Sequence, residues 1–102
     1  MVKITVWQGV KRVVLGEDVD SVDYVEFQGE LIGSSWEEEN ARGTHTTFYR
    51  RADGWIVVHQ VRWSRWEGEP TYGDVYEFPS LEAAEAAFWR EMEQAGICSQ
   101  RA

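Results

Sequence analysis

Two β-rich segments separated by a short turn signal constrain this chain more than any other feature. Residues 44–51 and 55–63 are rich in β-branched and aromatic side chains, the types that favour strands. Ala52-Asp53-Gly54 lies between them. Glycine can adopt the positive φ that closes a tight turn, and aspartate favours the position before it. The pattern predicts a β-hairpin around Asp53-Gly54.

The second strand of this hairpin is apolar on both faces. Alternation gives one face Trp55, Val57, Val61 and Trp63, and the other face Ile56 and Val58. Such a strand is normally central in a sheet and covered on both sides. One helix can cover one face, so the other needs either the N-terminal strands or a second copy of the chain. A homodimer formed through the sheet is therefore one of two interpretations.

The N-terminal third reads as strands. Residues 2–7 alternate apolar and polar side chains, Gln8-Gly9 is a plausible turn, and residues 10–15 can return as a second strand. An acidic connection follows at 16–21, and residues 22–32 resemble a long strand in which Gly29 is a candidate bulge. The turn-rich segment from Gly33 to Gly43 is expected to be mobile.

The C-terminal third predicts a loop over 66–71, a strand over 72–78 and then one helix. Apolar residues recur at helical spacing, which predicts an α-helix over about 81–95: Leu81, Ala84, Phe88, Met92 and Ala95. Ser80 can cap its first turn, and Gly96 can end it with Ile97 packing back. We therefore predict an α+β fold, in which one helix packs on an antiparallel sheet of five or six strands.

Length and composition fit one soluble domain spanning residues 1–102. The chain is 43% hydrophobic and 27% charged, and no apolar run approaches the roughly 18 to 20 residues that a membrane-spanning helix needs. The N-terminus lacks the apolar core of a signal peptide. Cys98 is the only cysteine, so it has no internal disulfide partner. We expect a cytoplasmic protein that does not bind membranes.

The charges are sorted in blocks along the chain. Residues 13–41 hold nine acids and no Lys or Arg, residues 42–66 hold five arginines and one acid, and residues 67–94 hold eight acids and one arginine. The net charge of −8 argues against direct nucleic acid binding. The central arginines either form a basic patch or face acids on neighbouring strands. The second interpretation expects two sets of pairs: Arg62 with Asp74 or Glu77, and Arg50 or Arg51 with Glu26 or Glu30.

Tryptophan and arginine occur together at the end of the second hairpin strand, in Trp63-Ser64-Arg65-Trp66. Both types dominate binding hot spots in protein–protein interfaces. The candidate binding residues are His59, Arg62, Trp63, Arg65 and Trp66, and the candidate acidic surface is Glu37, Glu38 and Glu39. We expect Trp63 to be structural, and Arg65 and Trp66 to be accessible to a partner. The alternative is that the aromatic side chains are core or rim packing.

No motif in the sequence indicates catalysis. His45 and His59 share a sheet face if the hairpin turn has three residues, and lie on opposite faces if it has two. A zinc site needs three or four ligands, and the spacing supplies no third. Nucleophile-elbow, phosphate-loop and His-Glu-x-x-His motifs are absent. We predict no catalytic residues, no metal and no other cofactor.

Three functions remain open from the sequence. The first is a small regulatory or adaptor-like protein that binds a protein partner, or itself, through the Trp/Arg-rich sheet surface. The second is an acidic nucleic-acid mimic that occupies a basic partner protein. The third is a ligand-binding protein or enzyme with a pocket between sheet and helix.

Overall fold

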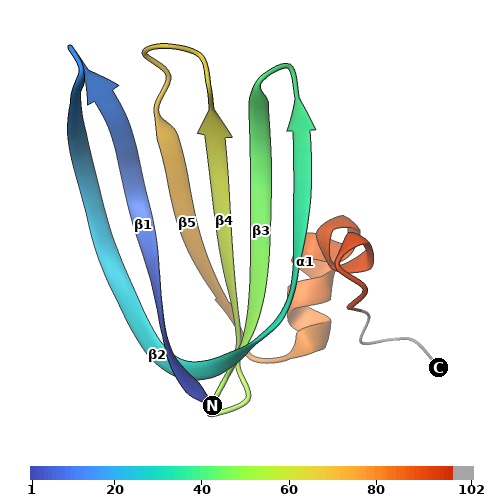
Figure 1. Ribbon diagram of the computed structural model, residues 1–102. Helices are drawn as coiled ribbons and strands as arrows, with labels where there is room; N and C mark the ends of the chain where they lie inside the picture. The colour runs from blue at the N-terminus through green and yellow to red at the C-terminus, as the bar shows by residue number, and fades with distance from the viewer. Residues whose placement is uncertain (98–102) are drawn as a thin grey trace.

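A computed structural model describes residues 1–97. Its elements are five strands and one helix: β1 (Val2–Val14), β2 (Glu17–Glu39), β3 (Arg42–Arg51), β4 (Ile56–Ser64), β5 (Thr71–Phe78) and α1 (Leu81–Gln94). Each strand pairs antiparallel with the next, and β1 also pairs with β5, so the sheet closes into a small barrel (Figure 1). The predicted α+β fold is confirmed, with five strands.

The first turn lies further along the chain than predicted. Strand β1 continues through Gly9 to Val14, and the chain turns at Leu15-Gly16, where both residues have positive φ. The predicted turn at Gln8-Gly9 is therefore wrong.

Gly9 instead lies where the barrel closes. Its φ is +130°, and a Cβ there would lie 2.2 Å from the carbonyl oxygen of Ser21 on β2. On its other side Gly9 pairs with Gly73 of β5, against which the Trp7 ring packs. Glycine permits both the backbone angle and the close approach of two strands.

Strand β2 is far longer than predicted. It includes most of the expected acidic connection and the segment expected to be mobile, because its second half pairs with β3 up to Glu39. The bulge lies between Leu31 and Gly33, where the register shifts, and not at Gly29. The turn that follows is Asn40-Ala41. Pairing with β3 outweighs the turn-forming composition, since strand formation depends strongly on context.

The β3–β4 hairpin has the three-residue register. Arg51 N–H donates to the carbonyl of Trp55 over 2.8 Å, and Arg50 pairs with Ile56. Odd-numbered residues of both strands therefore share one face. Phe48, Ile56 and Val58 lie on the other face, where they form the core with α1.

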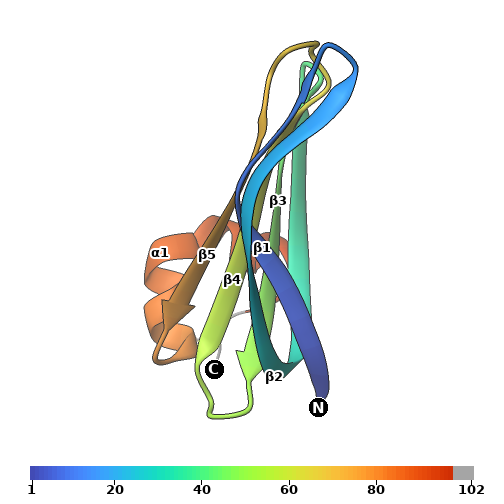
Figure 2. The same ribbon diagram turned by 90° about the vertical axis from the view of Figure 1, so that its left-hand side faces the viewer.

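Strand β1 and the first half of β2 cross the sheet on the side away from α1 (Figure 2). Val57, on the odd-numbered face of β4, is 1% exposed. The chain's own N-terminal strands thus cover this part of the second face. Val57 therefore needs no second copy of the chain to cover it, whereas Trp55 on the same face is 38% exposed. The homodimer stays a prediction.

The helix begins and ends as the sequence predicts. The Ser80 hydroxyl accepts from the N–H of Ala83 over 3.1 Å. Gly96 has a φ of +76°, and Ile97 N–H donates to the carbonyl of Met92 over 2.8 Å. Within residues 1–97 no helix is long and apolar enough to cross a bilayer. The interpretation of Cys98 falls outside the described residues.

Candidate interaction surface at the loop end

Three connections gather at the end of the barrel away from the N-terminus (Figures 1 and 2). They are the β1–β2 turn, the β2–β3 turn and the β4–β5 loop. We call this region the loop end and define it as residues 11–20, 38–42 and 64–71. The backbone N–H of Arg65 donates to the carbonyl of Ala41 over 2.8 Å. This hydrogen bond joins the β4–β5 loop to the β2–β3 turn.

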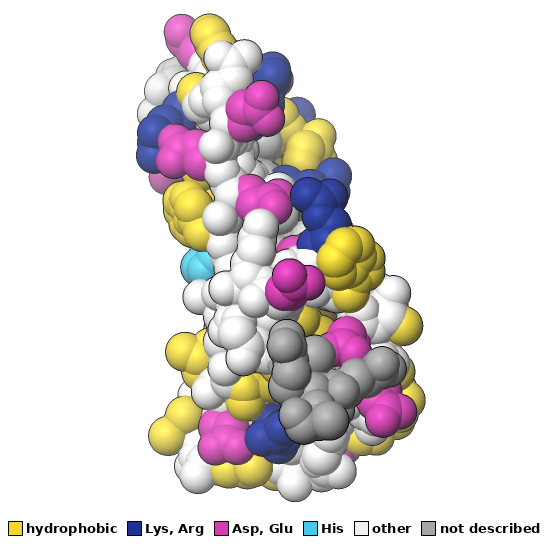
Figure 3. Space-filling model, turned by 90° about the vertical axis from the view of Figure 1, so that its right-hand side faces the viewer, with side chains coloured by type: hydrophobic (Ala, Val, Ile, Leu, Met, Phe, Trp, Pro, Cys, Tyr) yellow, Lys and Arg dark blue, Asp and Glu magenta, His cyan; other side chains and the backbone are white. Residues whose placement is uncertain are grey.

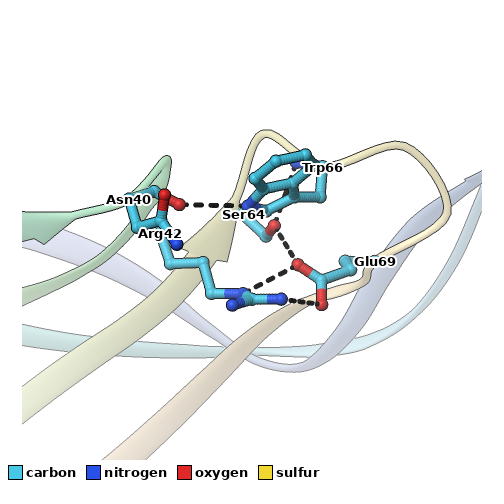
Figure 4. A network of polar contacts seen from close by, with 5 residues as sticks. All are labelled: Asn40, Arg42, Ser64, Trp66 and Glu69. Carbon is cyan, nitrogen blue, oxygen red and sulfur yellow. Dashed lines mark hydrogen bonds and ion pairs between the residues drawn. The ribbon is translucent and has the colours of Figure 1, made fainter.

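A network of polar contacts fixes the β4–β5 loop (Figure 4). Arg42 donates to both carboxylate oxygens of Glu69, from Nε over 3.0 Å and from Nη2 over 2.7 Å. The Ser64 hydroxyl donates to the same carboxylate. These donors lower the pKa of Glu69 to about 2. The loop therefore has an ionic anchor on β3 and a hydroxyl anchor on β4.

Trp66 is exposed yet held in place. Its side chain leaves half of the residue's surface exposed (50%). The backbone N–H donates to the Ser64 hydroxyl over 3.0 Å, and the indole Nε1 donates to the carbonyl of Asn40 over 3.0 Å. A large aromatic surface is thus presented to solvent in a fixed orientation.

Trp63 is packed against other side chains, whereas Trp66 is exposed. Its ring lies 5.5 Å from the ring of Trp36, and a Cβ on Gly43 would meet it at 2.2 Å. The Trp63 Nε1 is buried and has no hydrogen-bond partner within the described residues. Arg65 lies over this ring at 4.9 Å and donates to Glu38 over 2.8 Å. Arg65 thus links the packed indole to the acidic end of β2.

Arg62 and His59 do not join this cluster. Arg62 lies on the same sheet face as Val58, donates to Asp74 over 3.2 Å and lies over the Tyr72 ring at 5.1 Å. His59 lies on the opposite face, with its ring 5.8 Å from that of Trp7. Its Nε2 is buried without a partner among the described residues, and burial lowers its pKa below 6.5.

The two histidines lie on one face, as the three-residue turn requires. His45 pairs with Val61 and His59 with Thr47, so they are diagonal neighbours. Among residues 1–97, no three His, Cys, Asp or Glu residues are grouped so that they could hold a metal ion. The histidine pair therefore has no third protein ligand there.

The central arginines are all neutralised. Their ion pairs are Arg42–Glu69, Arg50–Glu30, Arg51 with Asp53 and Glu77, Arg62–Asp74, and Arg65–Glu38. The expected pairs of Arg62 with Asp74 and of Arg50 with Glu30 are confirmed. Figure 3 shows basic and acidic side chains interspersed on one face of the molecule. The basic block of the sequence forms no basic patch.

A groove of about 720 Å³ lies between the sheet and the C-terminal half of α1. Arg42, Arg62, Arg90 and the expected acidic residues Glu37, Glu38 and Glu39 line it. Arg42 and Arg62 are already paired with carboxylates, and Glu37 accepts from Gln94 over 3.0 Å. The groove thus offers an anionic ligand little free positive charge.

Sequence reasoning missed the residues that hold Trp66, namely Asn40, Arg42, Ser64 and Glu69. They are ordinary loop and strand-end residues, and Arg42 and Glu69 lie 27 positions apart. No local pattern brings them together.

Comparison with protein families, curated proteins and solved structures finds no match.

Proposed function

We propose that this protein is a binding module for another protein, and that the loop end is its contact surface. The observation that supports this most is Trp66, which is half exposed while both its backbone and indole N–H groups are held. An aromatic anchor that is already ordered loses little conformational entropy when a partner covers it. This proposal narrows the contact from the whole Trp/Arg-rich sheet surface to Arg65, Trp66 and their neighbours.

The charge of the chain favours a protein over the other large partners. Its net charge is −8, and the central arginines are already in ion pairs. Phosphate backbones and anionic lipids both repel such a surface. Trp and Arg, which meet at Arg65-Trp66, are the types that most often dominate protein–protein binding.

Quantitative affinity capture from cells that naturally contain the protein tests this proposal. Wild type is compared with Trp66→Ala and with Trp89→Ala, which removes another exposed indole (58% exposed) from α1. We expect Trp66→Ala to reduce recovery of a specific partner at least about tenfold, since a hot-spot residue contributes about 2 kcal/mol or more. Trp89→Ala should retain it.

Control measurements separate a loss of binding from a loss of folding. Each variant is first checked for wild-type circular dichroism. A partner retained by Trp66→Ala, or lost equally with Trp89→Ala, contradicts the proposal. A second copy of this chain counts as the partner only if tagged and untagged copies co-purify in a Trp66-dependent way.

A further inference from the structure

We infer that Leu15, at the tip of the β1–β2 hairpin, is an anchor that enters an apolar pocket on the partner, and that lysine or arginine side chains border this pocket. The inference rests on the proposed function. It adds a second contact residue and the chemistry of the partner surface.

Leu15 projects from the molecule without packing on it. Its residue is 99% exposed, and its neighbours Val13, Val14 and Val19 are exposed too. Leu15 buries almost none of its surface in the folded chain, and the three valines beside it leave about half of theirs exposed. Their burial requires a concave apolar surface on another molecule.

The turn itself does not explain the leucine. Leu15 has a φ of +52°, in the left-handed region, and Gly16 follows with a φ of +80°. A two-residue hairpin turn with two positive φ angles favours Asn-Gly, and leucine is poorly suited to its first position. Leu15 therefore serves neither the core nor the turn. A residue that the fold disfavours and exposes is a candidate for function.

The tip shares a groove with Trp66. A groove of about 590 Å³ runs between the hairpin and the β4–β5 loop, and its lining includes Val13, Leu15, Arg65 and Trp66. One partner surface can therefore contact both Leu15 and Trp66. This continuity makes the two side chains parts of one contact.

The charge around the tip defines the rim of the partner's pocket. Within residues 1–97, five carboxylates of the loop end take part in no ion pair: Glu17, Asp18, Asp20, Glu39 and Glu67. Two cations there, Lys11 and Arg12, are likewise in no ion pair. The excess is three negative charges, and Figure 3 shows apolar and acidic side chains together at the top of the molecule. Electrostatic complementarity therefore requires lysine or arginine side chains at the rim of the partner's pocket.

Site-specific photocrosslinking in the native cell tests the inference. A photoreactive phenylalanine analogue replaces Leu15, Trp66 or, as a control, Leu31, an exposed leucine (62%) outside the loop end. We expect the analogues at positions 15 and 66 to give an adduct with the same protein, and the analogue at 31 to give none. Mass spectrometry of the position-15 adduct should locate an apolar segment with neighbouring lysine or arginine residues.

The adducts separate the possible failures. An adduct from position 66 but not 15 overturns the inference and leaves the proposed function standing. No protein adduct from either position contradicts both. An adduct from position 15 to lipid, to nucleic acid or to a segment without basic residues overturns the inference.

Binding measurements with the identified, purified partner complete the test. Leu15→Asn should weaken binding about tenfold or more, because the partner's pocket would lose a buried leucine side chain. Leu31→Asn should leave binding unchanged. Raising the salt from about 0.1 to about 1 M shortens the screening length from about 10 to about 3 Å, so affinity should fall several-fold. An affinity that resists both Leu15→Asn and salt refutes the inference.

Discussion

Replacing Gly9 by alanine tests how the barrel closes. A Cβ on Gly9 would lie 2.2 Å from the Ser21 carbonyl oxygen and 2.9 Å from the Cα of Val22, on a backbone with a φ of +130°. Two other glycines separate these effects. Gly16 has a φ of +80° with open space around it, whereas at Gly73 only contact arises, with the Trp7 ring at 2.5 Å.

The expected losses follow from these geometries. Gly16→Ala should lower the free energy of unfolding by about 1 to 2 kcal/mol, the cost of a left-handed non-glycine residue. Gly73→Ala should lower it by about 1 to 3 kcal/mol through overpacking. Gly9→Ala combines both costs, about 2 to 5 kcal/mol. Its loss should lie near the upper end, because the contacted backbone cannot move aside as a side chain can.

Urea unfolding followed by tryptophan fluorescence measures the series. With an m value of about 1 to 3 kcal/mol/M, a loss of about 3 kcal/mol lowers the midpoint by about 1 to 3 M. Such a loss is a large part of the stability of a domain of this size, about 5 to 15 kcal/mol. If Gly9→Ala costs no more than Gly16→Ala, β1 does not approach Ser21 closely and our account of the closure is wrong.

Three further predictions concern stability. Trp63→Ala should lower the melting temperature more than Trp66→Ala, because Trp63 packs against Trp36; equal losses would mean that Trp66 is core. Burial lowers the pKa of His59 below 6.5, so the unfolded chain binds the proton first. The free energy of unfolding should therefore fall as the pH falls from 6.5 towards the folded-state pKa, and urea midpoints of His59→Gln should lack this dependence. The pKa of Glu69 is lowered from 4.5 to about 2, so its contribution should be complete above pH 4.5 and lost towards pH 2; a midpoint profile unchanged by Glu69→Gln over this range would contradict this.

The hairpin and the helix could be predicted because their signals are local. Asp53-Gly54 lies between two β-rich segments, and Ser80 and Gly96 mark the two ends of one apolar helical stripe. The positive φ of Gly54 and Gly96 fits these positions. Each element is determined by residues within about one turn of it.

The predictions from sequence were wrong where residues far apart in the chain determine the local structure. A glycine with positive φ can make either a turn or a bend, and only the pairing of Gly9 with Val22 and Gly73 distinguishes them. The segment after Gly33 has the composition of a loop, but it pairs with β3. Arg65 and Trp66 could be proposed as binding residues because tryptophan and arginine are common in interfaces. The contact of Trp66 with Asn40 could not be predicted, because it spans 26 positions in the sequence.

The thinness of the β1–β5 seam has a consequence for how the protein avoids aggregation. This seam has three paired positions on each strand, whereas β1 and β2 share thirteen. Every other pairing within residues 1–97 joins consecutive strands, so this seam alone joins β1 to β5 across the meander. Opening it would leave four strand pairings intact and free main-chain N–H and C=O groups on two edge strands. Exposed edges recruit strands from other chains. The few contacts around Gly9 and Gly73 therefore keep these segments of β1 and β5 from pairing with other copies of the chain.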